Sequence, residues 1–148
     1  MTSVEPKDEE GRPMDVQDIV EIQQLLALYG HVVDEPGQPR LRLVFTEDAV
    51  MDGKAAGMGL MEGRDAIAAF FALGAPPHPP SHNGGNVYVY EEGGETRAAS
   101  KWLAVDLRDN SIVSGDYQDV LVRTPEGWRI KRRSFLIRHP AGYAKDMA

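Results

Sequence analysis

The stretch VYVYEEGGETRAASKWLAVDLRDNSIVSGDYQDVLVRTPEGWRIKRRSFLIR, residues 87–138, decides the fold. Apolar and polar residues alternate along most of it, which is the period of strands that bury one face. The alternating runs are Val87–Glu91, Thr96–Leu107, Ile112–Arg123 and Trp128–Arg138. Short sequences rich in Gly, Asn, Asp and Pro separate them, as in tight turns. The sequence therefore predicts an antiparallel meander of four strands.

Upstream of this stretch the period becomes helical. Ile19, Ile22, Leu26, Tyr29 and Val33 recur at steps of three and four, behind Asp15 as a possible N-cap, so a helix is expected to about Asp34. The expected elements that follow are a short helix over Arg40–Phe45, a strand over Ala49–Asp52, a loop over Lys54–Glu62 and a helix over Arg64–Leu73. Four prolines within residues 76–80 then exclude a helix or an inner strand. Helices followed by a meander predict an α+β fold, with the helices on one face of a bent sheet and a pocket at its open end.

Length and composition fit one globular domain. The 148 residues carry a net charge of −7, and 42% of them are hydrophobic. We expect a flexible acidic arm over residues 1–14, a domain over 15–140 and a tail over 141–148. The acidic balance argues against a nucleic-acid partner. The polar N-terminus argues against a signal peptide or membrane anchor, and the lack of Cys fits the reducing cytoplasm.

His82 and Asp34 are the best candidates for chemistry. Asp34 closes the first helix, and His82 stands just before the alternating sequence begins, so both are expected at the mouth of the pocket. A carboxylate beside an imidazole fixes its tautomer and raises the basicity of the other ring nitrogen. Gly30, one turn before Asp34, costs about 1 kcal/mol relative to Ala within a helix. It therefore indicates close approach by a ligand or another backbone.

Other residues allow a structural as well as a functional reading. Tyr29 can be a core residue or a hydrogen-bond donor in the pocket. Met51, Met58 and Met61 can line an adaptable pocket or fill gaps in the core. His31, His78 and His139 are expected at the surface. One inward His and one carboxylate fall short of a usual ligand set, so no metal site is predicted.

Several phrases resemble the SnoaL-like branch of the nuclear transport factor two superfamily. They are Tyr29 with Asp34, LVFTEDA (43–49), EGRDAI (62–67), His82 with Asn86, GDYQD (115–119) and GWRI (127–130). The resemblance covers about Asp15 to Arg138. It implies a cone of helices against a curved sheet with a central cavity, the fold also used by ketosteroid isomerase and scytalone dehydratase.

The same resemblance implies roles for individual residues. His82 would be the base of an elimination, Asp34 its orienting partner, and Tyr29 a donor to a leaving group or carbonyl. Arg133 would stabilise an anion, with the adjacent Arg132 as the alternative. Candidate substrate contacts are Gly30, Met51, Met58, Met61, Asn86 and Tyr117. The chain departs from scytalone dehydratase in lacking a clear match to its second catalytic His.

The expected function is a lyase or isomerase that needs no cofactor and acts on an apolar, oxygenated ring compound. One alternative is a module that binds a small molecule or a protein without catalysis. Another is a hydrolase or cyclase that uses Asp34 as its main acid or base. Asp116 and Asp119 have opposite strand parity, so at most one can face the pocket. Apolar residues expected on the outer sheet face, such as Leu103, Val105 and Leu107, predict a homodimer.

Overall fold

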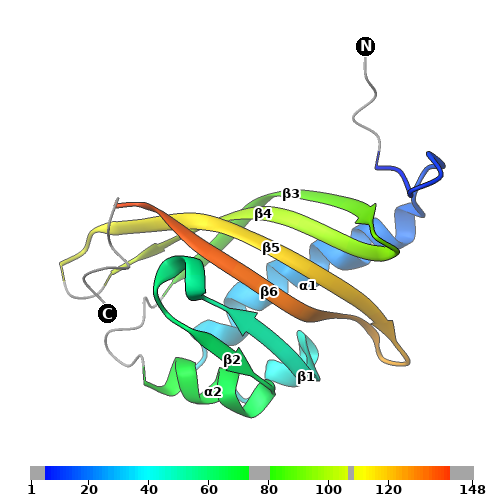
Figure 1. Ribbon diagram of the computed structural model, residues 1–148. Helices are drawn as coiled ribbons and strands as arrows, with labels where there is room; N and C mark the ends of the chain where they lie inside the picture. Colours follow the sequence, from blue (N-terminus) through cyan, green and yellow to red (C-terminus); the bar gives the residue numbers. More distant parts are fainter. Residues whose placement is uncertain (1–5, 74–80, 107–108, 141–148) are drawn as a thin grey trace.

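A six-stranded mixed sheet forms the body of the molecule. The computed structural model describes residues 6–73, 81–106 and 109–140. The strands lie in the order β2-β1-β6-β5-β4-β3, and every neighbouring pair is antiparallel except β1 and β6, which run parallel. One long helix crosses one face of the sheet, and a shorter helix lies beside the two short strands (Figure 1). The predicted α+β class is confirmed.

The predicted meander is present, with each strand pairing with the next. Its strands are β3 (His82–Glu92), β4 (Glu95–Val105), β5 (Ile112–Thr124) and β6 (Gly127–His139). β3 begins five residues earlier than we predicted, because His82 pairs with Ala104 of β4. The sequence hides this start, since two glycines precede a register shift at which Asn86 has a φ of 53°. Leu107, the predicted end of β4, lies outside the described residues.

The segment before the second helix differs from prediction. Instead of a helix over Arg40–Phe45, a 3₁₀ turn spans Leu41–Leu43, and Phe45 already starts β1 (Phe45–Asp52). The reason is tertiary: Phe45 is fully buried and pairs with Ile130 of β6. The predicted loop contains a 3₁₀ turn (Lys54–Ala56) and the edge strand β2 (Leu60–Glu62), in which Met61 pairs with Met51.

Both long helices appear at the predicted places. α1 (Val16–Asp34) begins behind Asp15, whose side chain accepts a hydrogen bond from the Asp18 N–H. Its buried stripe packs against β3 and β6 and consists of Ile22, Leu25, Leu26, Tyr29, Val32 and Val33. α2 (Arg64–Ala72) buries Ile67 and Phe71 against β1 and β2. The proposed end of this helix at Gly74 and the proline-rich connection lie outside the described residues.

The described part of the N-terminal arm, residues 6–14, makes local contacts. Asp8 accepts hydrogen bonds from the Glu10 and Arg12 backbone and from the Arg12 side chain. Glu9 accepts one from the Gly94 N–H in the turn between β3 and β4. Glu9 thus links this part of the arm to the β3–β4 hairpin.

Candidate active site

The end of α1 meets the start of β3 through the side chain of Asp34. Asp34 Oδ1 lies 2.6 Å from Nδ1 of the His82 ring, and Asp34 Oδ2 accepts the backbone N–H of His82 at 2.8 Å. One carboxylate therefore holds both the ring and the backbone of the same residue. With Asp34 ionised, Nδ1 carries the hydrogen, and proton transfer is left to Nε2.

Gly30 makes this meeting of helix and strand possible. A Cβ at position 30 would lie 2.7 Å from the backbone oxygen of His82, closer than real Cβ contacts come. The space left by Gly30 is thus filled by the backbone of β3, and this is the close approach by another backbone that the sequence suggested. We had also proposed Gly30 as a substrate contact, and Gly30 does line the cavity. A glycine is required at this position because the His82 backbone leaves no room for a side chain.

The imidazole of His82 lies in an aromatic setting. The rings of Tyr29 and Phe71 stand nearly perpendicular to it, each with its centroid 6.4 Å away. The side chains of His82 and Asp34 are 10% and 22% exposed. The imidazole is therefore shielded from bulk water, while the carboxylate keeps some hydration. Such partial shielding strengthens the electrostatic interactions of the pair.

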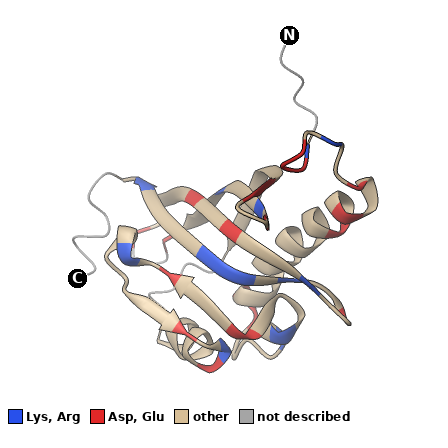
Figure 2. Ribbon diagram, turned by 45° about the vertical axis from the view of Figure 1, so that its right-hand side comes forward, with Lys and Arg blue, Asp and Glu red and all other residues tan. Residues whose placement is uncertain are grey.

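The three consecutive basic residues of β6 lie in three different environments. Lys131 is exposed, Arg132 contacts Asp52 at 2.6 Å, and Arg133 is only 1% exposed. Figure 2 shows this basic stretch as a blue segment of the sheet, with Asp and Glu, in red, at other positions on the strands. The structure thereby decides between the two candidates, because Arg133 faces the interior beside Tyr29.

Arg133 is held by one carboxylate and two rings. Its Nε and Nη2 donate to Asp119 at 2.7 and 2.8 Å, and Asp119 is as deeply buried as Arg133. The guanidinium carbon lies 4.0 Å from the ring centroid of Tyr29 and 3.8 Å from that of Tyr117. This pairing orients the guanidinium in a single direction.

Burial sets the protonation of these groups. It raises the pKa of Tyr29, and it raises that of Tyr117 well above the usual value, while the charge of Arg133 opposes both rises. Burial also works against the charge of Arg133, but Asp119 and the two tyrosines outweigh it and raise the pKa of the guanidinium. At neutral pH both phenols are therefore protonated donors and Arg133 is a cation.

A small cavity joins these side chains. It offers about 60 Å³ and is bounded by α1, by β3 and by the inner face of β4, β5 and β6. Among its lining residues are Tyr29, His82, Trp102, Tyr117 and Arg133. For comparison, an apolar cavity that binds benzene measures about 150 Å³. A ring compound can therefore enter only if side chains move apart.

Four of the proposed substrate contacts do not line this cavity. Met51 and Met61 lie in the hydrophobic core, and Met58 packs against it. Asn86 is exposed, in the left-handed conformation that the register shift of β3 requires. Tyr117, in contrast, lines the cavity. The three methionines thus pack in or against the core and do not line this cavity.

Sequence reasoning missed three residues that shape the site. Asp119 shares its strand with Asp116, and parity could not show which one turned inward. Trp102 stacks on Tyr117 with a ring-centroid distance of 5.8 Å, and its buried indole N–H has no hydrogen-bond partner among the described residues. Contacts between distant elements, which no local pattern reveals, bring Trp102 to the cavity and place Asp119 against Arg133 and Phe71 against His82.

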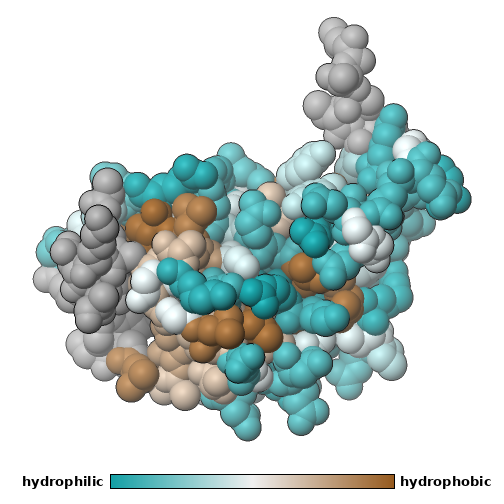
Figure 3. All heavy atoms as spheres, in the orientation of Figure 1, coloured by the Kyte–Doolittle hydropathy of each residue, from teal (hydrophilic) through white to brown (hydrophobic). Residues whose placement is uncertain are grey.

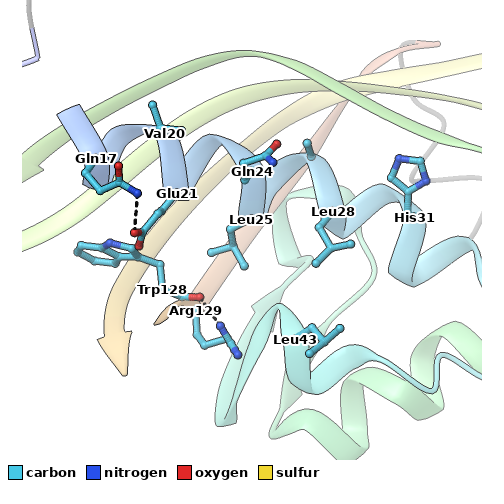
Figure 4. Close-up of a pocket in the computed structure, with 11 residues that line it drawn as sticks. Gln17, Val20, Glu21, Gln24, Leu25, Leu28, His31, Leu43, Trp128 and Arg129 are labelled. Atoms are coloured by element: carbon cyan, nitrogen blue, oxygen red, sulfur yellow. Dashed lines mark hydrogen bonds between the residues drawn. The ribbon is translucent and has the colours of Figure 1, made fainter. Parts of the chain in front are cut away.

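A second and wider hollow lies along the solvent side of α1. It measures about 580 Å³ and lies between that helix, Leu43 and the start of β6. Figure 4 shows Glu21 and His31 well separated along the helix. Glu21 and His31 are ten positions apart in the sequence, which corresponds to about 15 Å along the helix. This hollow therefore holds no acid–base pair comparable to His82 and Asp34.

Two further observations concern the described residues only. No three His, Asp or Glu side chains in this part of the chain come together in a way that could hold a metal ion. None of the helices in the described ranges is both long and apolar enough to span a membrane.

Helices packed on one face of a curved sheet place the chain in a class of small α+β domains. The chain belongs to the SnoaL-like domain family, whose model matches residues 14–134. The resemblance read from the sequence is therefore confirmed. Among its relatives is the uncharacterized protein Rv2910c of Mycobacterium tuberculosis, which is 34% identical over 131 residues, covering 80% of this chain and 84% of that protein.

Solved structures share the same architecture. A candidate aromatic ring hydroxylase from Novosphingobium aromaticivorans superimposes with a TM-score of 0.68 at 29% identity, covering 86% of this chain and 93% of the other. A candidate scytalone dehydratase from the same species gives a TM-score of 0.64 at 18% identity, covering 83% and 85%. At 18% identity, the likeness to the candidate scytalone dehydratase concerns the fold alone.

Proposed function

We propose that this protein is a lyase or isomerase that removes a proton from a carbon atom beside a carbonyl group and needs no cofactor. The observation that carries the proposal is the 2.6 Å contact between His82 Nδ1 and Asp34 Oδ1. It fixes the tautomer in which Nε2 is the basic atom, and an imidazole is a suitable base near neutral pH. Membership of the SnoaL-like family and the likeness in fold to a candidate scytalone dehydratase agree with this reaction class.

The remaining side chains of the cavity supply the second half of such a reaction. Removing a proton beside a carbonyl leaves negative charge on the carbonyl oxygen. Tyr29 and Arg133 are a protonated phenol and a guanidinium in the same cavity, and both can stabilise that charge. The His82 imidazolium then returns its proton to another carbon, as in isomerisation, or to a departing hydroxyl, as in dehydration.

The geometry favours His82 over Asp34 as the principal base. Both carboxylate oxygens of Asp34 are engaged by His82, one by the ring and one by the backbone N–H. A hydrolase or cyclase centred on Asp34 would need that carboxylate to face the substrate. The other alternative, a module that captures a ligand without catalysis, would use the same cavity but would exchange no proton.

Deuterium exchange tests the proposal without knowledge of the natural substrate. Ketones that carry an aromatic ring, such as 2-tetralone and acetophenone, are incubated with the protein in D₂O. Loss of the α-proton signal is followed by NMR. His82→Ala should lower the protein-dependent rate by about 10²- to 10⁴-fold. His31→Ala is the matched control, because it removes an exposed imidazole from the opposite side of α1. Equal rates for wild type and His82→Ala would refute the proposal, and binding of a ketone without exchange would favour the binding module.

A further inference from the structure

The buried pair of Asp119 and Arg133 is the most costly polar feature of the interior. Both side chains lie out of water, with exposed fractions of 0% and 1%. Ion pairs at such depth contribute little net stability, because their desolvation offsets their attraction. Arg133 also stands at the wall of the cavity, beside the ring of Tyr29, and Asp119 lies behind it. Its position therefore suggests a part in recognition as well as in packing.

One donor of this pair is left over. Asp119 engages Nε and Nη2 of Arg133, whereas Nη1 is buried without a hydrogen-bond partner among the described residues. A buried charged donor without a partner is unfavourable unless something else supplies an acceptor. Because Arg133 lines the cavity, its Nη1 suits a ligand that brings an oxygen acceptor.

The charges around the cavity limit which oxygen can bind. Among the described residues that line the cavity, Arg133 is the one with a permanent charge, and the carboxylate of Asp119 already balances it. Asp34, behind His82, adds a second carboxylate. With a neutral imidazole these four groups together carry one net negative charge. A carboxylate or phosphate ligand would meet this charge in a poorly hydrated space, where repulsion is strong.

We infer that Asp119 is a specificity-determining residue that makes this cavity accept a neutral carbonyl or hydroxyl oxygen and reject anions of the same shape. Asp119 acts through Arg133, because its carboxylate balances the charge of the guanidinium. A ligand that binds without a charge therefore meets a neutral ion pair. Negative charge that develops on the ligand oxygen during the proposed reaction still lies near the guanidinium of Arg133. This inference builds on the site of the proposed function and names its substrate class: uncharged oxygenated ring compounds.

Acetophenone and benzoate test the inference on the unmodified protein. They share a phenyl ring and a planar carbonyl group and differ in that benzoate carries a charge. Binding is followed through the indole N–H signals in ¹⁵N–¹H NMR spectra, since the chain has only two tryptophans and Trp102 lines the cavity. The Trp128→Phe variant assigns the two signals. Acetophenone should shift the Trp102 signal and bind at least about tenfold more tightly than benzoate.

Two variants separate the role of Asp119 from general damage to the fold. Asp119→Asn removes the balancing charge, so benzoate should gain at least about tenfold in affinity relative to acetophenone. Asp116→Asn is the matched control: it removes a carboxylate from the same strand, but from the outer face, where Asp116 contacts Lys101 and Arg138. Its preference for acetophenone should equal that of the wild type.

The outcomes are distinct. Benzoate binding as tight as acetophenone in the wild type, or no shift of the Trp102 signal with either compound, would overturn the inference even if Asp119→Asn failed to fold. An unchanged preference in a folded Asp119→Asn variant would overturn it as well. The proposed function fails separately: a protein that prefers acetophenone but exchanges no α-proton would keep the specificity and lose the reaction.

Discussion

At the scale of single residues, Gly30 connects the stability of the fold to the position of His82. In an unobstructed helix, replacing Gly with Ala would stabilise the protein by about 1 kcal/mol. Here the new methyl group would stand 2.7 Å from the His82 backbone oxygen, so β3 or the helix has to shift. Gly30→Ala should therefore destabilise the protein by about 1–3 kcal/mol in urea unfolding. A variant more stable than wild type would show that this approach is not tight.

The residues of the site were only partly predictable from sequence. Asp34 and His82 could be named because each ends or begins a periodic segment, and the resemblance supplied their roles. Arg133 could not be separated from Arg132, since a bulge anywhere in β6 would exchange their faces. The register of β5 against β6, which pairs Asp119 with Arg133, decides this and depends on distant contacts.

At the scale of elements, the four long strands were predictable and the short ones were not. Alternation over ten or more residues is a strong signal, and β4, β5 and β6 carry it. β2 has three residues, with one of them buried, which is too short for any period. The parallel pairing of β1 with β6 joins segments about eighty residues apart, so the predicted meander gave no hint of it.

The outer faces of β4, β5 and β6 are joined by Asp116, and acid should weaken this link. Hydrogen bonds from Arg138, followed by those from Lys101, lower the pKa of Asp116 below its ordinary value of 3.8. A carboxyl group whose pKa is lower in the folded than in the unfolded protein stabilises the fold at pH values above its pKa in the unfolded chain. This stabilisation is lost as the pH falls through the pKa of the folded state. Unfolding free energies should thus fall more steeply below about pH 4 for wild type than for Asp116→Asn. Parallel curves for the two proteins would contradict this assignment.

At the scale of the whole molecule, the sheet face turned away from α1 is expected to pair with a second copy. Figure 3 shows apolar groups spread among polar ones over this face. Tyr88, Leu103 and Ile112 are 55%, 44% and 54% exposed, which is high for large apolar residues. We expect a homodimer in sedimentation at micromolar concentration, and Leu103→Glu should shift it toward monomer. A monomeric wild type would refute this expectation; Leu107, which also suggested it, lies outside the described residues.

The account depends on one arrangement: Asp34 at the end of α1 holds the imidazole of His82 through Nδ1. The ¹⁵N shifts of the His82 ring, measured by NMR on the neutral imidazole, report the tautomer directly. We predict that Nδ1 carries the hydrogen in the wild type, and that Asp34→Asn weakens this preference. A wild-type ring with its hydrogen on Nε2 would contradict the account, because the atom proposed as the base would then be a donor.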